Sequence, residues 1–147
     1  MAGLNEALGG GGIHHVGLRV MNFETSIKFY TEVLGLKILI DCPHPWEPDI
    51  VDHICFLDTG DGNCIEIFTG GKQDSVEFDQ YRAGTYFHLA LRSNKVDAVV
   101  ERARKAGTTI LVEPLDVRLV AYNGDVKLAR VAFILGPDGE QVELFQE

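Results

Sequence analysis

The sequence predicts an α+β fold built from two tandem copies of one module, each a strand, a helix and further strands. Three pairs of similar segments indicate the duplication. In the first pair, HVGLRV at residues 15–20 resembles HLALRS at 88–93. In the second, DGNCIEIF at 61–68 resembles DGEQVELF at 138–145. A repeat that spans most of the chain favours two similar structural units over one unrepeated fold.

The third pair of segments predicts one helix in each module. Residues 22–35 and 94–107 each begin with an asparagine and end with a glycine. Asparagine is a favoured N-cap, and glycine often ends a helix because it adopts a positive φ angle readily. Apolar side chains recur at helical spacing on one face of each segment. They are Phe23, Ile27, Tyr30 and Leu34 in the first, and Val96, Val99, Val100 and Ala103 in the second.

The remaining strands follow from short apolar runs bounded by turn residues. The turn sequences TGDGN and GPDG precede the last strand of each module, and such turns connect hairpins. The last two strands of each module should therefore pair antiparallel. The runs lie at roughly 36–41, 50–58, 109–121 and 127–135.

The modules are expected to form a single domain, because each half alone is too small to bury much core. Module one covers about residues 13–69, a polar connector covers 70–84, and module two covers about 85–147. Residues 1–12 contain a run of glycines and are interpreted as a flexible N-terminal segment. They lack the features of a signal peptide.

Composition narrows the range of partners. The formal net charge of −9 disfavours nucleic acid and anionic membrane surfaces. No segment is apolar for long enough to cross a membrane. The three cysteines have no metal-binding spacing, which is typical of a reduced compartment without disulfides. We therefore predict a cytoplasmic protein that acts on a small molecule.

Alternation along the strands separates four polar side chains from the apolar positions. His15 lies on the face opposite Val16 and Leu18, and the same split recurs in the other three strands. Each strand places one potential ligand on the face away from the helices: His15, Glu66, His88 and Glu143. By the same alternation His14 falls on the other face, at the start of its strand, where we expect it to be solvated.

Two imidazoles and two carboxylates, one of each per module, predict a site for a divalent first-row metal. A carboxylate among apolar neighbours is costly to bury unless it is paired or binds a metal. Ni, Co, Zn, Mn and Fe all suit this mixed set of nitrogen and oxygen ligands. The alternative is two ordinary half-buried histidines and two glutamates on solvent-facing edge strands.

At these residues the sequence resembles the vicinal oxygen chelate (VOC) superfamily. That superfamily includes glyoxalase I, methylmalonyl-CoA epimerase, extradiol dioxygenases and the fosfomycin and bleomycin resistance proteins. The stretch ETSIKFYTEVLGLKI and the ending GPDGEQVELF also look like the family. The resemblance implies two βαβββ modules whose curved mixed sheets enclose a cavity, the glyoxalase-like fold. It implies His15, Glu66, His88 and Glu143 as metal ligands, a set closest to bacterial-type glyoxalase I.

The reaction expected from this resemblance is that of a metal-dependent lyase or isomerase. A small α-oxygenated substrate, a hydroxy-carbonyl compound or a thiohemiacetal, would undergo proton transfer through a metal-stabilised enediolate. Glu143 or Glu66 would be the general base, with Glu143 favoured by position. Arg19 falls where glyoxalase I has an arginine that contacts the glutathione carboxylate, and Phe68 and Phe145 could line the substrate pocket.

Several alternatives stay open. The family's glutathione-contacting asparagine meets Gly70 in this chain, a departure that leaves the use of glutathione as a co-substrate unsettled. An epimerase of methylmalonyl-CoA type, an Fe(II) dioxygenase and a non-catalytic drug-binding resistance protein are the competing functions. Family members commonly form homodimers, and in some the metal site is shared between two chains. The same is expected here, with the site either within one chain or across a dimer.

Overall fold

The computed structural model describes residues 7, 13–43, 53–72, 83–84, 86–121 and 123–147. The predicted N-terminal segment at 1–12, apart from residue 7, lies outside the described residues, as do residues 50–52 of one expected strand and 73–82 of the connector. Contacts divide the chain into two compact units. The first unit consists of Met1–Met21 and Leu36–Gly71, and the second of Asn22–Gly35 and Lys72–Glu147.

The first unit contains a four-stranded sheet in the order β1-β4-β3-β2. β1 runs parallel to β4, whereas β4 with β3 and β3 with β2 are antiparallel. The predicted antiparallel pairing of the last two strands of the module is therefore confirmed. The strands are β1 (His15–Arg19), β2 (Lys37–Cys42), β3 (Ile54–Asp58) and β4 (Cys64–Phe68).

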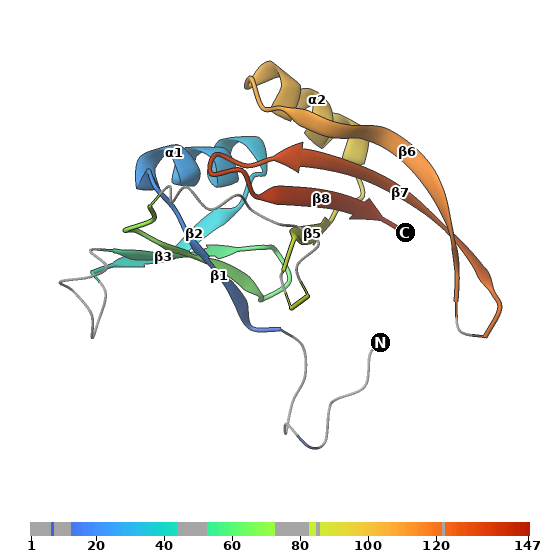
Figure 1. Ribbon diagram of the computed structural model, residues 1–147, viewed down its shortest axis with the longest axis horizontal. Helices are drawn as coiled ribbons and strands as arrows, with labels where there is room; N and C mark the ends of the chain where they lie inside the picture. Colours follow the sequence, from blue (N-terminus) through green and yellow to red (C-terminus); the bar gives the residue numbers. More distant parts are fainter. Residues whose placement is uncertain (1–6, 8–12, 44–52, 73–82, 85, 122) are drawn as a thin grey trace. The chain divides into compact units, whose positions relative to one another are not determined.

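The second unit contains a sheet of the same topology, in the order β5-β8-β7-β6 (Figure 1). Again the first and last strands of the module, β5 and β8, are parallel, and the other pairs are antiparallel. Two mixed four-stranded sheets with few helices confirm the predicted α+β class. The strands are β5 (His88–Arg92), β6 (Ile110–Val120), β7 (Val126–Leu135) and β8 (Gln141–Gln146).

The first predicted helix is composite. It consists of α1 (Phe23–Lys28) and a π-helical turn, η2 (Phe29–Val33). Asn22 caps it as predicted, because its side chain accepts a hydrogen bond of 2.9 Å from the backbone N–H of Thr25. Gly35 ends it with a φ angle of 78°.

The π-helical turn changes which side chains of this helix are buried. Tyr30 is buried as the predicted face requires, but Phe23 and Ile27 of that face are only half-buried. Phe29 and Val33 are buried instead. A π turn has more residues per turn than an α-helix, so positions spaced for an α-helix drift off one face. The predicted first face is therefore only partly correct.

The second helix, α2 (Val96–Lys105), buries Val96, Val100 and Ala103 of the predicted face, and Val99 is half-buried. Gly107 follows it with a φ angle of 81°. The predicted N-cap is wrong, since Lys95 occupies the cap position and makes no side-chain capping bond. Instead the Ser93 hydroxyl accepts from the Lys95 N–H at 3.0 Å, so a serine one residue before Asn94 supplies the local hydrogen bond.

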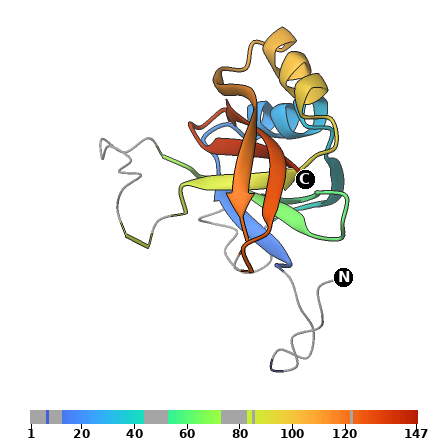
Figure 2. The same ribbon diagram turned by 90° about the vertical axis from the view of Figure 1, so that its right-hand side faces the viewer.

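α1 belongs to the second unit although it follows β1 in the chain. The Ser26 hydroxyl donates to Asp138 at 3.2 Å, and the Tyr30 hydroxyl donates to Glu140 at 2.7 Å. Both acceptors lie in the turn between β7 and β8, next to α1 in Figure 1. α2 lies beside η2, where Arg102 Nε donates to the carbonyl oxygen of Val33 (Figure 2).

The core of the second unit forms where α2 packs on its sheet. Its fully buried cluster consists of Val96 and Val100 from the helix with Ala132 and Leu144 from β7 and β8. Because side chains alternate, the neighbours Phe133 and Glu143 project from the other face of the sheet. The packing of α2 thus turns the predicted ligand face away from the helix. No helix in the described ranges is long and apolar enough to cross a membrane.

Candidate metal site

In the first unit, His15 and Glu66 meet across the parallel strands β1 and β4. The register pairs Gly17 with Glu66, so His15 is two residues along β1 and reaches the glutamate diagonally. His15 Nε2 lies 3.2 Å from Glu66 Oε2. The glutamate side chain is 12% exposed and the histidine 41%. The pair thus consists of a largely buried carboxylate and a partly exposed imidazole.

In the second unit, His88 and Glu143 repeat this arrangement on β5 and β8. The register pairs Ala90 with Glu143, which again places the histidine two residues away along the parallel strand. His88 Nε2 lies 3.2 Å from Glu143 Oε2, the same separation as in the first pair. The glutamate is 13% exposed and the histidine 28%. The duplication seen in the sequence therefore extends to side-chain geometry.

The chemistry of these pairs fits a divalent metal. Each carboxylate lies between buried apolar neighbours, Ile65 and Ile67 in one unit and Val142 and Leu144 in the other. A carboxylate in such surroundings needs a cationic or hydrogen-bonding partner. The imidazole at 3.2 Å supplies one, and nitrogen and oxygen donors on adjacent strands are a set that first-row metals accept.

The structure brings the predicted ligands together as two pairs, one in each unit. Within the described ranges, no three or more His, Cys, Asp or Glu side chains group closely enough to hold a metal ion. Each pair supplies two donors, whereas a protein metal site commonly has three or four protein ligands. Neither pair alone supplies as many donors as such a site commonly has.

A phenylalanine accompanies each pair, and the sequence-based reasoning missed both. Phe56 is the register partner of Glu66, and its ring lies 5.5 Å from that of His15, centroid to centroid, at an interplanar angle of 76°. Phe133 is the register partner of Glu143 and lies 5.5 Å from the His88 ring at 86°. The interval between the two phenylalanines in the sequence equals the interval between the two glutamates. This interval marks the two phenylalanines as equivalent positions of the repeat, although it does not predict their contact with the histidines.

The residues that precede the two histidines differ. His14 is exposed, as expected, but its Nδ1 lies 2.9 Å from His15 Nδ1, so it is also hydrogen-bonded to the predicted ligand. Phe87 occupies the corresponding place beside His88, with ring centroids 4.4 Å apart and an interplanar angle of 86°. One predicted ligand histidine thus has a polar neighbour and the other an apolar one.

The predicted substrate residues Arg19 and Phe68 contact each other in the first unit. The Arg19 guanidinium carbon lies 5.6 Å from the centroid of the Phe68 ring, within cation–π range. Arg19 Nη1 also donates to the carbonyl oxygen of Thr69 at 3.0 Å. Phe145 occupies the corresponding place in the second unit, half-buried and opposite Arg92 in the register. Arg19 is therefore held beside β4, on the strand that also carries His15.

Backbone geometry accounts for the glycines after β4. Gly70 has a φ angle of 80°, a region in which side chains other than that of glycine are strained. A Cβ on Gly71 would lie 2.6 Å from the backbone of Val20. The second glycine permits this close approach, and its N–H donates to the Val20 carbonyl at 3.0 Å. The position that departs from the glutathione-contacting asparagine thus belongs to a tight turn.

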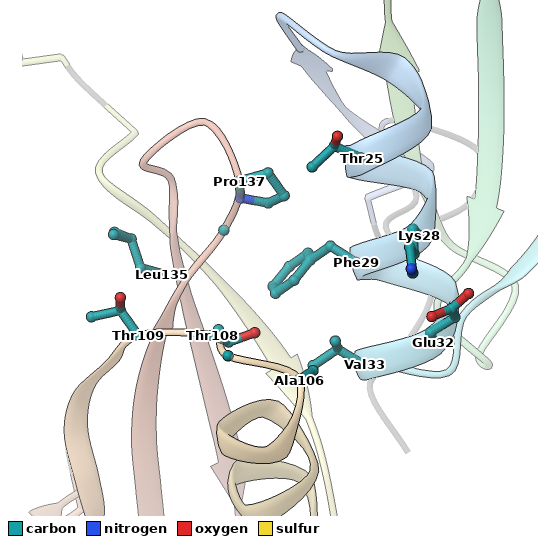
Figure 3. Close-up of a pocket in the computed structure, with 12 residues that line it drawn as sticks. Thr25, Lys28, Phe29, Glu32, Val33, Ala106, Thr108, Thr109, Leu135 and Pro137 are labelled. Atoms are coloured by element: carbon teal, nitrogen blue, oxygen red, sulfur yellow. The ribbon is translucent and has the colours of Figure 1, made fainter.

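A cavity of about 420 Å³ lies elsewhere in the second unit, between the α1–η2 helix and the segments 106–109 and 135–137. Figure 3 shows the Phe29 ring pointing into it from the helix, opposite Pro137 and Thr108. Its described lining includes none of the predicted ligands or substrate residues. The His–Glu pairs and this cavity are therefore separate features.

Two mixed sheets, each with a histidine on its first strand and a glutamate on its last, define a protein with duplicated βαβββ modules and candidate metal ligands. The chain belongs to the glyoxalase/bleomycin resistance protein/dioxygenase superfamily, whose family model matches residues 12–144. This membership confirms the predicted family resemblance and the glyoxalase-like fold.

Several related proteins are similar in sequence or structure to most of this chain. A probable lactoylglutathione lyase of Vibrio parahaemolyticus is 31% identical over 140 residues, covering 92% of this chain and 91% of the relative. The trypanothione-dependent glyoxalase I of Leishmania major superposes with a TM-score of 0.68 at 28% identity, over 93% of this chain and 87% of that one. Glyoxalase I of Zea mays gives 0.67 at 28% identity over 92% of this chain, which spans only 44% of the maize chain.

Proposed function

We propose that the protein is a divalent-metal-dependent lyase or isomerase of glyoxalase I type. The observation that carries the proposal is the repeated His–Glu pair, with the same 3.2 Å separation in both units. Similarity to proteins named lactoylglutathione lyase supports it. His15, Glu66, His88 and Glu143 would together hold one Ni, Co, Zn, Mn or Fe ion. When bound, the ion would polarise an oxygen of the substrate and favour enediolate character in the transition state.

The protein's own contribution to the reaction is proton transfer by a glutamate. A small α-oxygenated substrate loses the proton on the carbon next to its carbonyl group, and the same carboxylate returns it to the adjacent carbon. Glu143 is the favoured base and Glu66 the alternative. Both carboxylates are largely shielded from water, which limits exchange of the abstracted proton with solvent.

Substrate recognition is assigned to Arg19, Phe68 and Phe145. The Arg19 guanidinium is held by its contacts with Thr69 and Phe68, so it can offer its other N–H groups to an anionic part of the substrate. A substrate carboxylate, such as that of a glutathione adduct, has the matching charge. The glutathione-contacting asparagine is replaced by Gly70, so a co-substrate other than glutathione is included in the test below.

The proposal includes a homodimer in the cytoplasm. Each unit contributes only one His–Glu pair, and pairing of units between two copies is one way to assemble four donors around one ion. Monomers of such an enzyme would bind metal weakly and would be inactive.

Metal loading followed by a substrate screen tests the proposal. Purified protein would be loaded separately with each of the five ions, and its metal content measured by elemental analysis. Turnover would then be followed with methylglyoxal plus glutathione, methylglyoxal plus another thiol, and methylmalonyl-CoA. We expect one metal per four-ligand site and conversion of a thiohemiacetal. Protein that takes up none of these ions would overturn the proposal.

Substitution of each glutamate by glutamine separates the base from the ligands. Gln keeps an oxygen donor but cannot accept the proton as a base. We expect Glu143→Gln to retain metal and to lose roughly 100- to 10,000-fold in kcat, the usual contribution of a general base. Glu66→Gln should lose less. A Glu143→Gln variant with full metal content and undiminished turnover would exclude Glu143 as the base.

A further inference from the structure

The phenylalanines Phe56 and Phe133 contact the predicted ligand histidines in the same way in both units. In each sheet the strand with the glutamate lies between the strand with the histidine and the strand with the phenylalanine. The rings of histidine and phenylalanine meet across this middle strand at 5.5 Å between centroids in both cases. The register partner of each phenylalanine is the glutamate itself. Histidine, glutamate and phenylalanine thus form a repeated group of three.

These two phenylalanine rings are not part of the deepest core. Both phenylalanines are half-buried, while their chain neighbours Cys55 and Ala132 are fully buried. In the second unit Ala132 belongs to the cluster beneath α2, so Phe133 points to the other face of the sheet. A core position would explain one such ring, but core packing alone does not require the same ring geometry toward a histidine in both units.

An imidazole presents one nitrogen in a fixed direction only when rotation of its ring is restricted, and the Phe56 and Phe133 rings add to the contacts with His14 and Phe87 that already surround the two histidines. Rotation about the terminal side-chain torsion of histidine is broad, and a half-turn exchanges the ring nitrogens with ring carbons. An edge-on aromatic contact restricts that rotation, because the ring quadrupole favours a near-perpendicular arrangement. Groups that orient a ligand histidine without touching the metal typically change metal affinity by roughly 10- to 100-fold when removed.

We propose that Phe56 and Phe133 are positioning residues that hold the His15 and His88 rings with Nε2 directed toward Glu66 and Glu143. The inference rests on the proposed metal site and extends it to two residues that touch neither the metal nor the substrate. In each unit the near-perpendicular ring contact restricts the rotation of the imidazole. Leucine fills much of the same volume but offers no aromatic edge or face to the imidazole.

The test measures metal binding by Phe56→Leu and Phe133→Leu in the full-length protein. Affinity for Co²⁺ would be determined by competition with a chromogenic chelator, and the visible absorption spectrum of the bound Co²⁺ would report ligand geometry. We expect Co²⁺ affinity to fall roughly tenfold or more in each variant, with a changed spectrum. Phe56→Tyr and Phe133→Tyr keep the ring and should restore both. The matched control is Phe23→Leu, which removes a half-buried ring from α1 and should leave affinity and spectrum unchanged.

The outcomes distinguish this inference from the proposed function. Wild-type protein that binds no Co²⁺ overturns both. Wild-type binding together with wild-type affinity and spectrum in the two leucine variants overturns the positioning role alone. An equal loss in Phe23→Leu, or no rescue by tyrosine, also overturns it, because the loss would then reflect general destabilisation. If a leucine variant fails to fold, the methionine variant of the same position, which also lacks the ring, takes its place in the test.

Discussion

The two His–Glu pairs share their ligand geometry but differ in what surrounds it. The Nε2–Oε2 separation and the distance to the phenylalanine ring are the same in both units. The flanking residue, however, is polar His14 in the first unit and apolar Phe87 in the second. Under the proposed function the repeated features would serve the metal, and the flanking residues that differ would meet different parts of the substrate.

The arginines on the first strand of each module, Arg19 and Arg92, differ in how their side chains are held. Arg19 is held by the Thr69 carbonyl and the Phe68 ring, whereas Arg92 is 80% exposed and lies 3.8 Å from the carboxylate of Glu147. A solvent-exposed ion pair of this kind orders its side chains little. The first unit therefore has the better-ordered cation, and under the proposed function this cation would meet the anionic end of the substrate.

The largest expected effect comes from the buried cores that support the two pairs. Ile67 and Leu144 are both buried, each follows one of the two glutamates directly, and the two occupy equivalent positions in the repeat. Ile67→Ala and Leu144→Ala should each lower the free energy of unfolding by about 2–5 kcal/mol. Chemical denaturation followed by circular dichroism measures this. The surface variants Lys105→Ala and Lys37→Ala serve as controls and should change it by less than about 0.5 kcal/mol.

The number of unfolding transitions in the same two core variants tests whether the units unfold together. The chain passes from one unit to the other at residues 21–22, 35–36 and 71–72. Because the helix α1 of the first repeat belongs to the second unit, we expect a single unfolding transition in both core variants. Two separate transitions in either variant would show that the units are thermodynamically independent.

Much of this arrangement could be predicted from sequence because it depends on local periodicity. Alternation separated His15 and Glu66 from the apolar positions of their strands, and the glycine turns set the antiparallel pairing of β3 with β4. The contact of each histidine with a phenylalanine depends on two strands separated by a third, which no single run of sequence encodes. The repeat interval shows only that the two phenylalanines occupy equivalent positions.

Other features depend on contacts between distant segments. The π-helical turn Phe29–Val33 moves the buried face of the first helix, and its spacing looks α-helical in the sequence. Asn94 was expected to cap α2 by analogy with Asn22, but the hydroxyl of Ser93 accepts the hydrogen bond from the Lys95 N–H. The assignment of α1 to the second unit depends on the contact of Tyr30 with Glu140, which lies far along the chain.

The next largest effect is expected from removing either ligand histidine. If both pairs hold one ion, His15→Ala and His88→Ala should each weaken Co²⁺ binding by more than the roughly 10- to 100-fold that loss of an outer partner costs. Titration against a chelator measures the affinity. Lys127→Ala, at an exposed position of β7, is the control and should bind as the wild type. If Co²⁺ affinity falls in only one of the two histidine variants, the two pairs do not contribute equally to metal binding.

A smaller effect is expected at the arginines, where the two units should differ. Arg19→Gln should raise KM roughly tenfold or more with kcat nearly unchanged, since a charged hydrogen bond to the substrate is lost. Arg92→Gln should change KM less than about twofold, because its exposed ion pair orders it little. Steady-state kinetics with the substrate identified in the screen measures both. Equal effects of the two substitutions would remove the distinction between the units.

The smallest expected effect concerns Glu140, whose contact with Tyr30 has no counterpart in the first unit, since Asn63 stands at the repeated position. Burial raises the pKa of the Glu140 carboxyl above its ordinary value of 4.5, although the Tyr30 hydrogen bond opposes this. A raised pKa means that the folded chain holds the proton more tightly than the unfolded chain. Glu140 therefore contributes stability when protonated and loses it as pH rises through the folded pKa.

Glu140→Gln should accordingly remove part of the pH dependence of stability. Glutamine keeps the acceptor for Tyr30 and carries no charge at any pH. The free energy of unfolding of the variant should therefore exceed that of the wild type by more at neutral pH than at a pH near the ordinary carboxyl pKa. Denaturation curves at the two pH values measure the difference. Glu24→Gln, an exposed carboxylate on α1, is the matched control and should leave the wild-type slope in place. The stability of Glu140→Gln could instead fall with rising pH as steeply as that of the wild type. That result would mean that the Tyr30–Glu140 contact does not distinguish the second unit energetically.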